Sequence, residues 1–273
     1  MSMNALDNIV PMNHFETMDS VDIRDLERAK ALLESAGLAT RLTDLLGTPI
    51  EKGLEMLPER WNRRVMQITR SALSKAVQSA VLTMKTSHNK EPSKFWHKVA
   101  VGTTGGIGGF FGLGAMAVEL PISTTIMLRS IADIARSQGE QIKDPDTQMA
   151  CIETFALGAK SCDEACESAY FTVRAALAST VSQAIEHITQ RGLAGEFSPA
   201  IVRLIVQVTD RFSIQVSEKA IAQALPAVGA AGGIVVNTLF MDHFQDRATG
   251  HFIVRRLERK YDPALVKRIY SML

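Results

Sequence analysis

The sequence predicts an all-α protein, folded as a single compact domain of many helices. Helix-capping residues followed by helically spaced apolar residues recur along the 273-residue chain. No stretch has the sustained alternation of apolar and polar residues, bounded by hairpin turns, that is typical of strands. Hydrophobic residues make up 46% of the chain, which is enough for a sizeable core.

Residues 1–57 are predicted to form an N-terminal helical extension. Asp19 or Ser20 can cap a first helix, and Gly37 is expected to stop it. A second helix is expected over residues 38–56, weakened where a Gly-Thr-Pro sequence interrupts it.

Residues 58–273 are predicted to form the main helical domain. Pro58 suits the first turn of a long helix that ends near Lys85. Pro121 is expected to precede the next helix rather than lie within it. The remaining helices are expected at 122–139, 145–158, 161–192, 199–211 with an interruption at 212–217, a long helix ending near 261, and 263–273.

The overall charge points to no particular ligand. Lys and Arg number 30 against 29 Asp and Glu, so nothing favours nucleic acid or an acidic substrate. The N-terminus has neither the basic region nor the apolar core of a signal peptide, so we expect a cytoplasmic protein. The three cysteines, Cys151, Cys162 and Cys166, are expected to be reduced, small helix residues rather than metal ligands.

Positive charge is nevertheless concentrated in one region. Residues 59–98 hold nine Lys or Arg against two Glu, a net charge of +7. Along the helix expected after Pro58, the basic and polar residues follow one stripe. Such a helix either faces solvent or rests on anionic lipid.

Two stretches without charge, 99–118 and 220–241, are unusually rich in small residues. Small residues four apart let helix backbones approach closely, so we predict two central, glycine-rich helices. The glycines that carry this prediction are Gly102, Gly105, Gly106, Gly108, Gly109, Gly112, Gly229 and Gly233.

Both stretches have about the length needed to span a bilayer. They are rich in Gly, Thr and Ala rather than Leu or Ile, however, so their transfer into lipid is only weakly favourable. Three interpretations stay open: the centre of a wholly soluble bundle, a peripheral membrane contact, or a true membrane insertion.

Three blocks, at 105–140, 144–158 and 225–261, resemble the EcsC family in order, spacing and composition. The resemblance implies a helical protein of bacterial origin. It also implies a link to membrane transport, because the namesake of the family is encoded beside an ABC transporter. It supplies no secure catalytic motif, so no functional residue is carried over.

A polar cluster follows the second glycine-rich stretch. One helix of a bundle can supply carboxylate and imidazole groups to a metal site, and facing helices supply the rest. The candidates for a catalytic or metal site are Asp242, His243, Asp246 and His251, with Glu119 or Glu153 from other helices. No HExxH, GxSxG or GK[ST] motif accompanies them. The alternative is a hydrogen-bond and ion-pair network at a helix-packing seam.

Three functions are compatible with these features. The first is an accessory or interaction protein at the cytoplasmic face of the inner membrane, whose partners are an anionic membrane surface or a transporter complex. The second is a metal-assisted hydrolase that uses the polar cluster. The third is a protein that binds a lipid or another apolar ligand between the glycine-rich helices. No organic cofactor is expected.

Overall fold

A computed structural model describes residues 18–84, 112–158, 169–191, 199–225 and 229–273. Every regular element within these ranges is helical, which confirms the predicted all-α class. Five of the glycines that carry the close-packing prediction, from Gly102 to Gly109, lie outside the described residues, as does the predicted helix start at Ser161. Gly112 is the first residue of α6 and Gly229 the first of α10.

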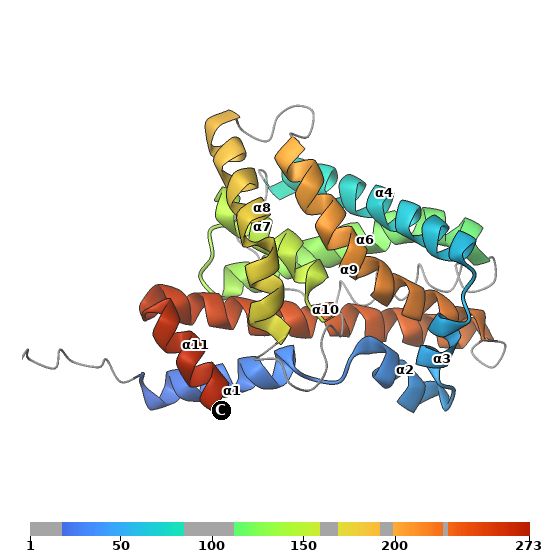
Figure 1. Cartoon of the computed structure of the whole chain (residues 1–273), viewed down its shortest axis with the longest axis horizontal. Helices are drawn as coiled ribbons and strands as arrows, with labels where there is room; N and C mark the ends of the chain where they lie inside the picture. Colours follow the sequence, from blue (N-terminus) through green and yellow to red (C-terminus); the bar gives the residue numbers. More distant parts are fainter. Residues whose placement is uncertain (1–17, 85–111, 159–168, 192–198, 226–228) are drawn as a thin grey trace, which may run out of the picture.

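The helices are labelled in Figure 1. Their bounds are α1 Ser20–Leu33, α2 Leu38–Leu46, α3 Ile50–Glu55, α4 Glu59–Met84, α6 Gly112–Ser137, α7 Pro145–Glu153, α8 Ala169–Arg191, α9 Pro199–Ala224, α10 Gly229–Lys260 and α11 Pro263–Met272, with a short 3-10 turn, η1, at Thr154–Ala156.

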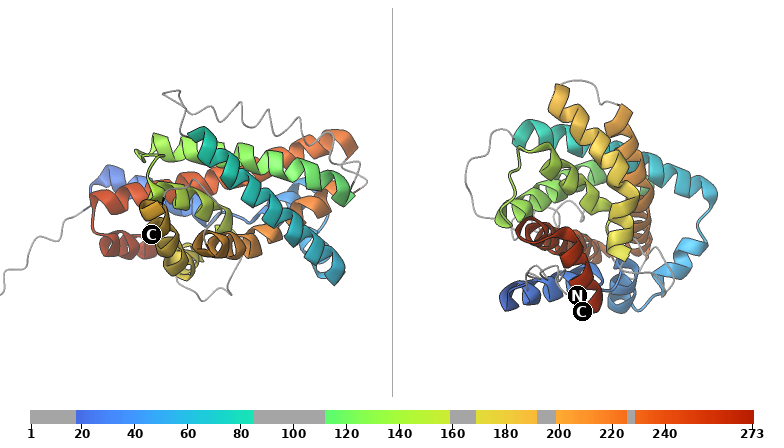
Figure 2. Two further views of the ribbon diagram at one scale, coloured as in Figure 1. Left: turned by 90° about the horizontal axis from the view of Figure 1, so that it is seen from above. Right: turned by 60° about the vertical axis from the view of Figure 1, so that its left-hand side comes forward.

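The 32-residue helix α10 runs through the middle of the fold. It contacts α1 and α2 on one side and α6 and α9 on another, and α11 folds back beside its C-terminal end. Helix α4 lies across α6 and α9, and α8 packs against α7 and α9 (Figures 1 and 2). Because α10 contacts so many other helices, its side chains make many of the contacts that stabilise the fold.

Aromatic rings fill the centre of the core. Phe155 lies 4.9 Å from Phe212 and 5.4 Å from Phe244, measured between ring centroids, and Phe240 lies 5.2 Å from Phe244. Such tilted and edge-on arrangements suit the ring quadrupoles. The period-four spacing of Phe240, Phe244 and Phe252 turns one face of α10 toward this core.

The helices before residue 58 share this core. Leu26, Leu42 and Ile50 are completely buried and belong to the same apolar cluster as the later helices. The boundary placed after residue 57 stays a prediction, although the described residues pack across it.

Local capping signals predicted several helix ends correctly. The Asp19 carboxylate accepts from the Val21 N–H, and the Asp262 carboxylate accepts from the N–H groups of Ala264 and Leu265. These two signals worked because a cap depends only on residues within one turn. The weakening expected near Gly47 is a complete break: Gly47 ends α2 in the left-handed conformation, with φ of 64°, and the helix expected over 38–56 is divided into α2 and α3.

Three expectations from local sequence were wrong. Pro121 lies inside α6 rather than before it. The break expected at 212–217 is absent, and α9 continues through it because Phe212 and Val216 are buried against other helices. Gly37 does not stop α1, which ends at Leu33; it precedes α2 instead. In the first two cases, tertiary packing outweighs the local cost.

None of the helices in the described ranges is both long and apolar enough to cross a membrane.

Candidate functional site

Helix α10 is buried along much of its length and yet strongly polar. A buried polar group costs free energy unless it is hydrogen-bonded, so each of these groups indicates where another element is held. Its buried polar and charged residues are Asn237, His243, Gln245, Arg247, Thr249 and His251.

Near its beginning, α10 meets a buried ion pair. Lys219 of α9 is 1% exposed, and its Nζ donates to Glu119 Oε1 of α6 over 2.6 Å. Asn237 Nδ2 approaches the same oxygen at 3.4 Å, and Lys219 also lies over the Phe240 ring. Glu119 Oε2 is buried and has no hydrogen-bond partner among the described residues. The ion pair joins α6 to α9, and Asn237 adds α10 to it. Both charges are buried in the core.

Further along α10, helix α1 packs very closely against it. An added Cβ at Gly250 would lie 2.6 Å from Leu33 Cγ and 2.9 Å from the carbonyl oxygen of Ala29. Only a residue without a side chain permits this approach. The two helices are therefore in backbone contact at Gly250.

The end of α1 is capped by a side chain of α10. Arg247 donates to the carbonyl oxygens of Leu32 and Ser35, over 2.6 and 2.9 Å. These are carbonyls at or just after the C-terminus of α1, where a cation is favourable. The preceding residue, Asp246, pairs with Arg41 at 3.0 Å.

Ion pairs between α1 and α10 continue to the end of α10. Arg256 pairs with Asp25 at 2.5 Å, and Lys260 pairs with Asp22 at 2.6 Å. The Tyr261 hydroxyl also donates to Asp22. The hydrogen bond from Lys260 is the main reason that the pKa of Asp22 lies below its usual value. Acidic residues of α1 thus match basic residues of α10.

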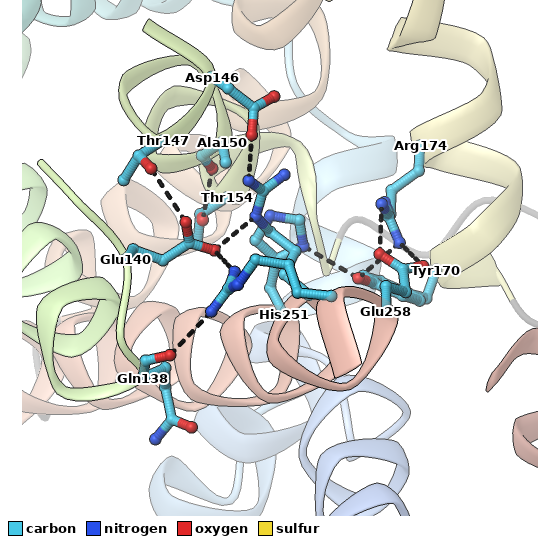
Figure 3. Close-up of polar contacts among 12 residues, drawn as sticks. Gln138, Glu140, Asp146, Thr147, Ala150, Thr154, Tyr170, Arg174, His251 and Glu258 are labelled. Carbon is cyan, nitrogen blue, oxygen red and sulfur yellow. Dashed lines mark hydrogen bonds and ion pairs between the residues drawn. The ribbon is translucent and has the colours of Figure 1, made fainter. Parts of the chain in front are cut away.

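A second set of contacts ties α10 to the segment that leads into α7 (Figure 3). Glu140 accepts from Arg255 at 2.9 Å, from Arg259, and from Thr147 at 2.9 Å. Arg255 also pairs with Asp146. Burial alone would raise the pKa of Glu140, but the Arg255 hydrogen bond and the neighbouring positive charges hold it below its usual value.

A third set ties α10 to α8 (Figure 3). Arg174 makes a two-pronged contact with Glu258, at 2.8 and 3.0 Å, and donates to the Tyr170 hydroxyl. That hydroxyl is 3.0 Å from His251 Nδ1. Burial, helped by Arg174 and Arg255, lowers the pKa of His251 well below its usual value, so this imidazole is neutral.

Glu153 lies at the end of α7, close to these two sets. Its side chain is buried, and burial raises the pKa of its carboxyl to about 7 in spite of the charges of Arg174 and Arg255. Such a carboxyl changes charge near neutral pH. This property is common at functional sites and also occurs in structural networks.

His243 is the most isolated of the buried polar groups. It is completely buried, and neither ring nitrogen has a hydrogen-bond partner among the described residues. An added Cβ at Gly158, where φ is 96°, would lie 2.7 Å from His243 Nε2 and 2.8 Å from Arg247 Nε. Burial, followed by the charges of Arg247 and Arg41, lowers the pKa of His243 well below its usual value.

The exposed face of α4 carries basic side chains, as α10 does, but these side chains face solvent instead of other helices. Its exposed basic residues are Arg60, Arg63, Arg64, Arg70 and Lys75. Within the described part of the chain, the ion pair on this face is Glu59 with Arg63, at 3.9 Å between side chains that are 89% and 68% exposed. Such an exposed pair contributes little to stability.

The family model for the EcsC protein family matches residues 20–257 of the 273-residue chain. The chain belongs to the EcsC protein family. The match begins with the first residue of α1 and ends near the end of α10. The α1–α10 contacts of Arg247, Gly250 and Arg256 therefore lie within the part that matches the EcsC family, whereas Lys260 lies beyond it. No curated protein matched this EcsC chain, and no solved structure did.

The structure of this EcsC protein separates most of the predicted site residues. Glu119 pairs with Lys219, Asp246 with Arg41, and His251 with Tyr170. Across the described ranges, no three His, Cys, Asp or Glu side chains are grouped so that they could hold a metal ion. These three contacts are of the hydrogen-bond and ion-pair kind that the sequence left open as an alternative.

Three candidates remain. Asp242 is half-buried on α10, and His243 is the isolated imidazole described above. Glu153 shares the neighbours Arg174 and Arg255 with His251, so these two predicted site residues lie in one electrostatic environment.

Of the three cysteines, the structure describes Cys151. Its thiol is free and buried, and burial raises its pKa to about 12. A thiol with so high a pKa is inert at neutral pH, as expected for a small core residue. Cys162 and Cys166 lie outside the described residues.

Local sequence patterns did not identify five residues of these networks, namely Glu140, Tyr170, Arg174, Lys219 and Glu258. Each has its partner at least 81 residues away in sequence, apart from local contacts. Helical periodicity identifies the face on which a residue lies, but it does not say which distant helix covers that face. No motif or spacing in one sequence could have paired them.

Proposed function

We propose that this EcsC protein is an accessory protein of the cytoplasmic membrane surface, which α4 holds reversibly on anionic lipid. The observation that carries this proposal is the exposed basic face of α4. The transporter complex expected from the family resemblance is, in this proposal, the protein partner that it meets at that surface.

The basic face supports the proposal because its cations are accessible. Five Lys or Arg side chains of α4 are exposed, and only Glu59 among the charged residues of α4 is acidic. A Lys or Arg close to an anionic membrane contributes about 1 kcal/mol to binding. Five of them would give weak, reversible attachment that salt screens.

The contacts of α10 support a role that depends on binding rather than on a reaction centre. Arg247, Arg255 and Arg256 each have partners on other helices or on the segments between them. Glu119, Asp246 and His251 are occupied in the same way. These groups stabilise the arrangement of helices that presents α4.

Neither of the other two functions gains a specific observation from the described residues. The candidate hydrolase residues are divided among several internal contacts. A shallow surface pocket lies between α1 and the C-terminal residue, lined by Glu27, Lys30, Ala31, Glu34 and Leu273, and so does not involve the glycine-rich starts of α6 and α10.

The proposal is tested by sedimentation with lipid vesicles. Wild-type protein should sediment with vesicles that contain phosphatidylglycerol, and not with vesicles of phosphatidylcholine alone. The variant Arg64→Glu/Arg70→Glu should lose most of this binding while it keeps its helical circular dichroism spectrum.

The matched control is Arg24→Glu/Arg28→Glu, which reverses two exposed cations of α1. It should bind anionic vesicles almost as wild type does. Equal loss of binding in both variants would mean that net charge, rather than the α4 face, governs the interaction. Absence of binding by the wild type would refute the proposal.

A further inference from the structure

Exposed apolar side chains gather at the beginnings of α6 and α10. On α6, Val118 is 67% exposed and Ile122 47%. On α10, Ile234 is 45% exposed and Val235 43%. Single exposed apolar residues are ordinary on protein surfaces, whereas a group of them indicates an interaction site.

The four residues occupy the same end of the molecule. Asn237, one turn after Ile234, donates to Glu119, which directly follows Val118. A second contact further along, from Gln245 to Ser130, shows that α6 and α10 run in the same direction. Both helices begin at the right-hand end in Figure 1 and in the left view of Figure 2.

The beginnings of these helices present no exposed charge. Between Gly112 and Leu128 the single charged residue is Glu119, and between Gly229 and Met241 there is none. Glu119 is 5% exposed and is neutralised by Lys219 inside the fold. The buried pair therefore removes from this surface the one charge that the sequence places there.

Helix α4 supplies positive charge beside this uncharged surface. It packs directly on α6 and begins at the same end of the molecule (Figures 1 and 2). Exposed apolar residues next to a basic face are typical of proteins that lie in the membrane interface. Their apolar side chains enter the boundary between headgroups and acyl chains, and their cations stay with the anionic headgroups.

We infer that Val118, Ile122, Ile234 and Val235 form an apolar anchor that enters the interface of an anionic bilayer beside α4. This inference rests on the proposed function and adds to it. The basic face provides the part of membrane binding that salt abolishes. The apolar anchor provides a part that persists when salt screens the charges, because burial of apolar surface does not depend on ionic strength.

The test measures binding to phosphatidylglycerol–phosphatidylcholine vesicles at low salt and at high salt, about 0.1 M and 0.5 M NaCl. The wild type should keep a measurable part of its binding at high salt. Val118→Asp/Ile234→Asp should lower that salt-resistant affinity at least about tenfold, because two apolar side chains no longer enter the interface.

The control is Val21→Asp/Met272→Asp, which places the same two charges at exposed apolar positions of α1 and α11. It should retain the salt-resistant binding. All these substitutions are at exposed positions, and thermal melting verifies that each variant is folded.

The failures can be told apart. If high salt releases the wild type completely, and Val118→Asp/Ile234→Asp binds at low salt as well as the control does, the anchor is wrong while the basic-face proposal stands. If the wild type binds no anionic vesicle even at low salt, both are wrong. If the control loses as much salt-resistant binding as the anchor variant, the four residues have no special role and the anchor is again overturned.

Discussion

Helices α10 and α4 both carry several arginines, but those of α10 contact other parts of the fold and those of α4 are exposed to solvent. Arg247, Arg255 and Arg256 of α10 contact carbonyls or carboxylates of other elements. The exposed arginines of α4, such as Arg64 and Arg70, project from a helix whose other face packs on α6 and α9. An arginine is thus committed to the fold where distant helices surround it, and is accessible to an external ligand where they do not.

This difference has an energetic basis. A buried charge that loses its partner leaves the other charge uncompensated, at a cost of several kcal/mol. A substitution of an exposed charge changes stability by a few tenths of a kcal/mol. Measurements of stability, followed by measurements of vesicle binding, therefore test whether the arginines of α10 and of α4 differ in this way.

The largest effect is expected where the buried ion pair is cut. Glu119→Gln should lower the free energy of unfolding by about 3–5 kcal/mol, because the Lys219 ammonium stays buried without its counter-charge. Urea denaturation measures the change. Glu119→Leu/Lys219→Met should recover most of the loss, and a loss below about 1 kcal/mol in the single variant would show that the pair does not matter.

The next effect concerns pH and Glu153. Its pKa rises from 4.5 to about 7 on folding, so the folded state holds a proton more tightly between these values. The stability from this group is present below pH 4.5 and is lost as the pH rises to about 7. Glu153→Gln should remove this loss and stabilise the protein above pH 7 by up to about 3 kcal/mol.

The buried histidines act in the opposite sense and provide an internal control. His243 and His251 have pKa values below 6.5 in the fold, so the unfolded chain binds protons first and stability falls as the pH drops below 6.5. In Glu153→Gln this histidine dependence should remain, without the opposing slope of the carboxyl. Unfolding curves at a series of pH values test both signs; identical profiles for the variant and the wild type would contradict this account of Glu153.

A smaller effect is expected where α1 touches α10. Gly250→Ala should lower the free energy of unfolding by about 1–3 kcal/mol, because the new methyl group meets the Ala29 carbonyl oxygen and Leu33. Gly53→Ala is the comparison, since the nearest atoms to its Cβ all belong to the Ile221 side chain, with Cγ2 at 2.9 Å, and none is a backbone atom. Thermal melting compares the two, and equal losses would mean that helix–helix proximity at Gly250 is unimportant.

The smallest effect on stability is expected on α4. Arg63→Gln/Arg64→Gln should change the free energy of unfolding by less than about 0.5 kcal/mol, because both side chains are exposed. Chemical denaturation measures this change. If the free energy of unfolding fell as much as it does when a buried ion pair is broken, the arginines of α4 would be as important to stability as those of α10, and the distinction between the two helices would be wrong.

What the sequence could predict follows from the range of the interactions involved. The caps at Asp19 and Asp262 depend on neighbours within a turn, and the structure confirms them. The continuity of α9 through Phe212 depends on distant packing, and local propensity predicted a break there. The sequence also identified the basic stripe of α4, because amphipathic periodicity alone determines which of its faces is exposed.

The candidate site shows the same limit. Periodicity placed His243 and His251 on one face of α10, but Tyr170 and Arg174, which surround His251, come from a helix more than 70 residues earlier. Likewise, nothing in the spacing of Glu119 indicates Lys219. The sequence thus supplied the polar groups, and only the fold shows which residues of other helices Glu119, Asp246 and His251 contact.

The most direct measurement of the division between α10 and α4 compares two variants with the same change in net charge. They are Arg63→Gln/Arg64→Gln on α4 and Arg255→Gln/Arg256→Gln on α10, each examined by thermal melting and by binding to anionic vesicles. The α4 variant should melt like the wild type and bind vesicles about 30-fold more weakly, because two contributions of about 1 kcal/mol each are lost. The α10 variant should melt at a lower temperature and, while folded, bind vesicles like the wild type. Equal weakening of vesicle binding in the two variants would contradict the account.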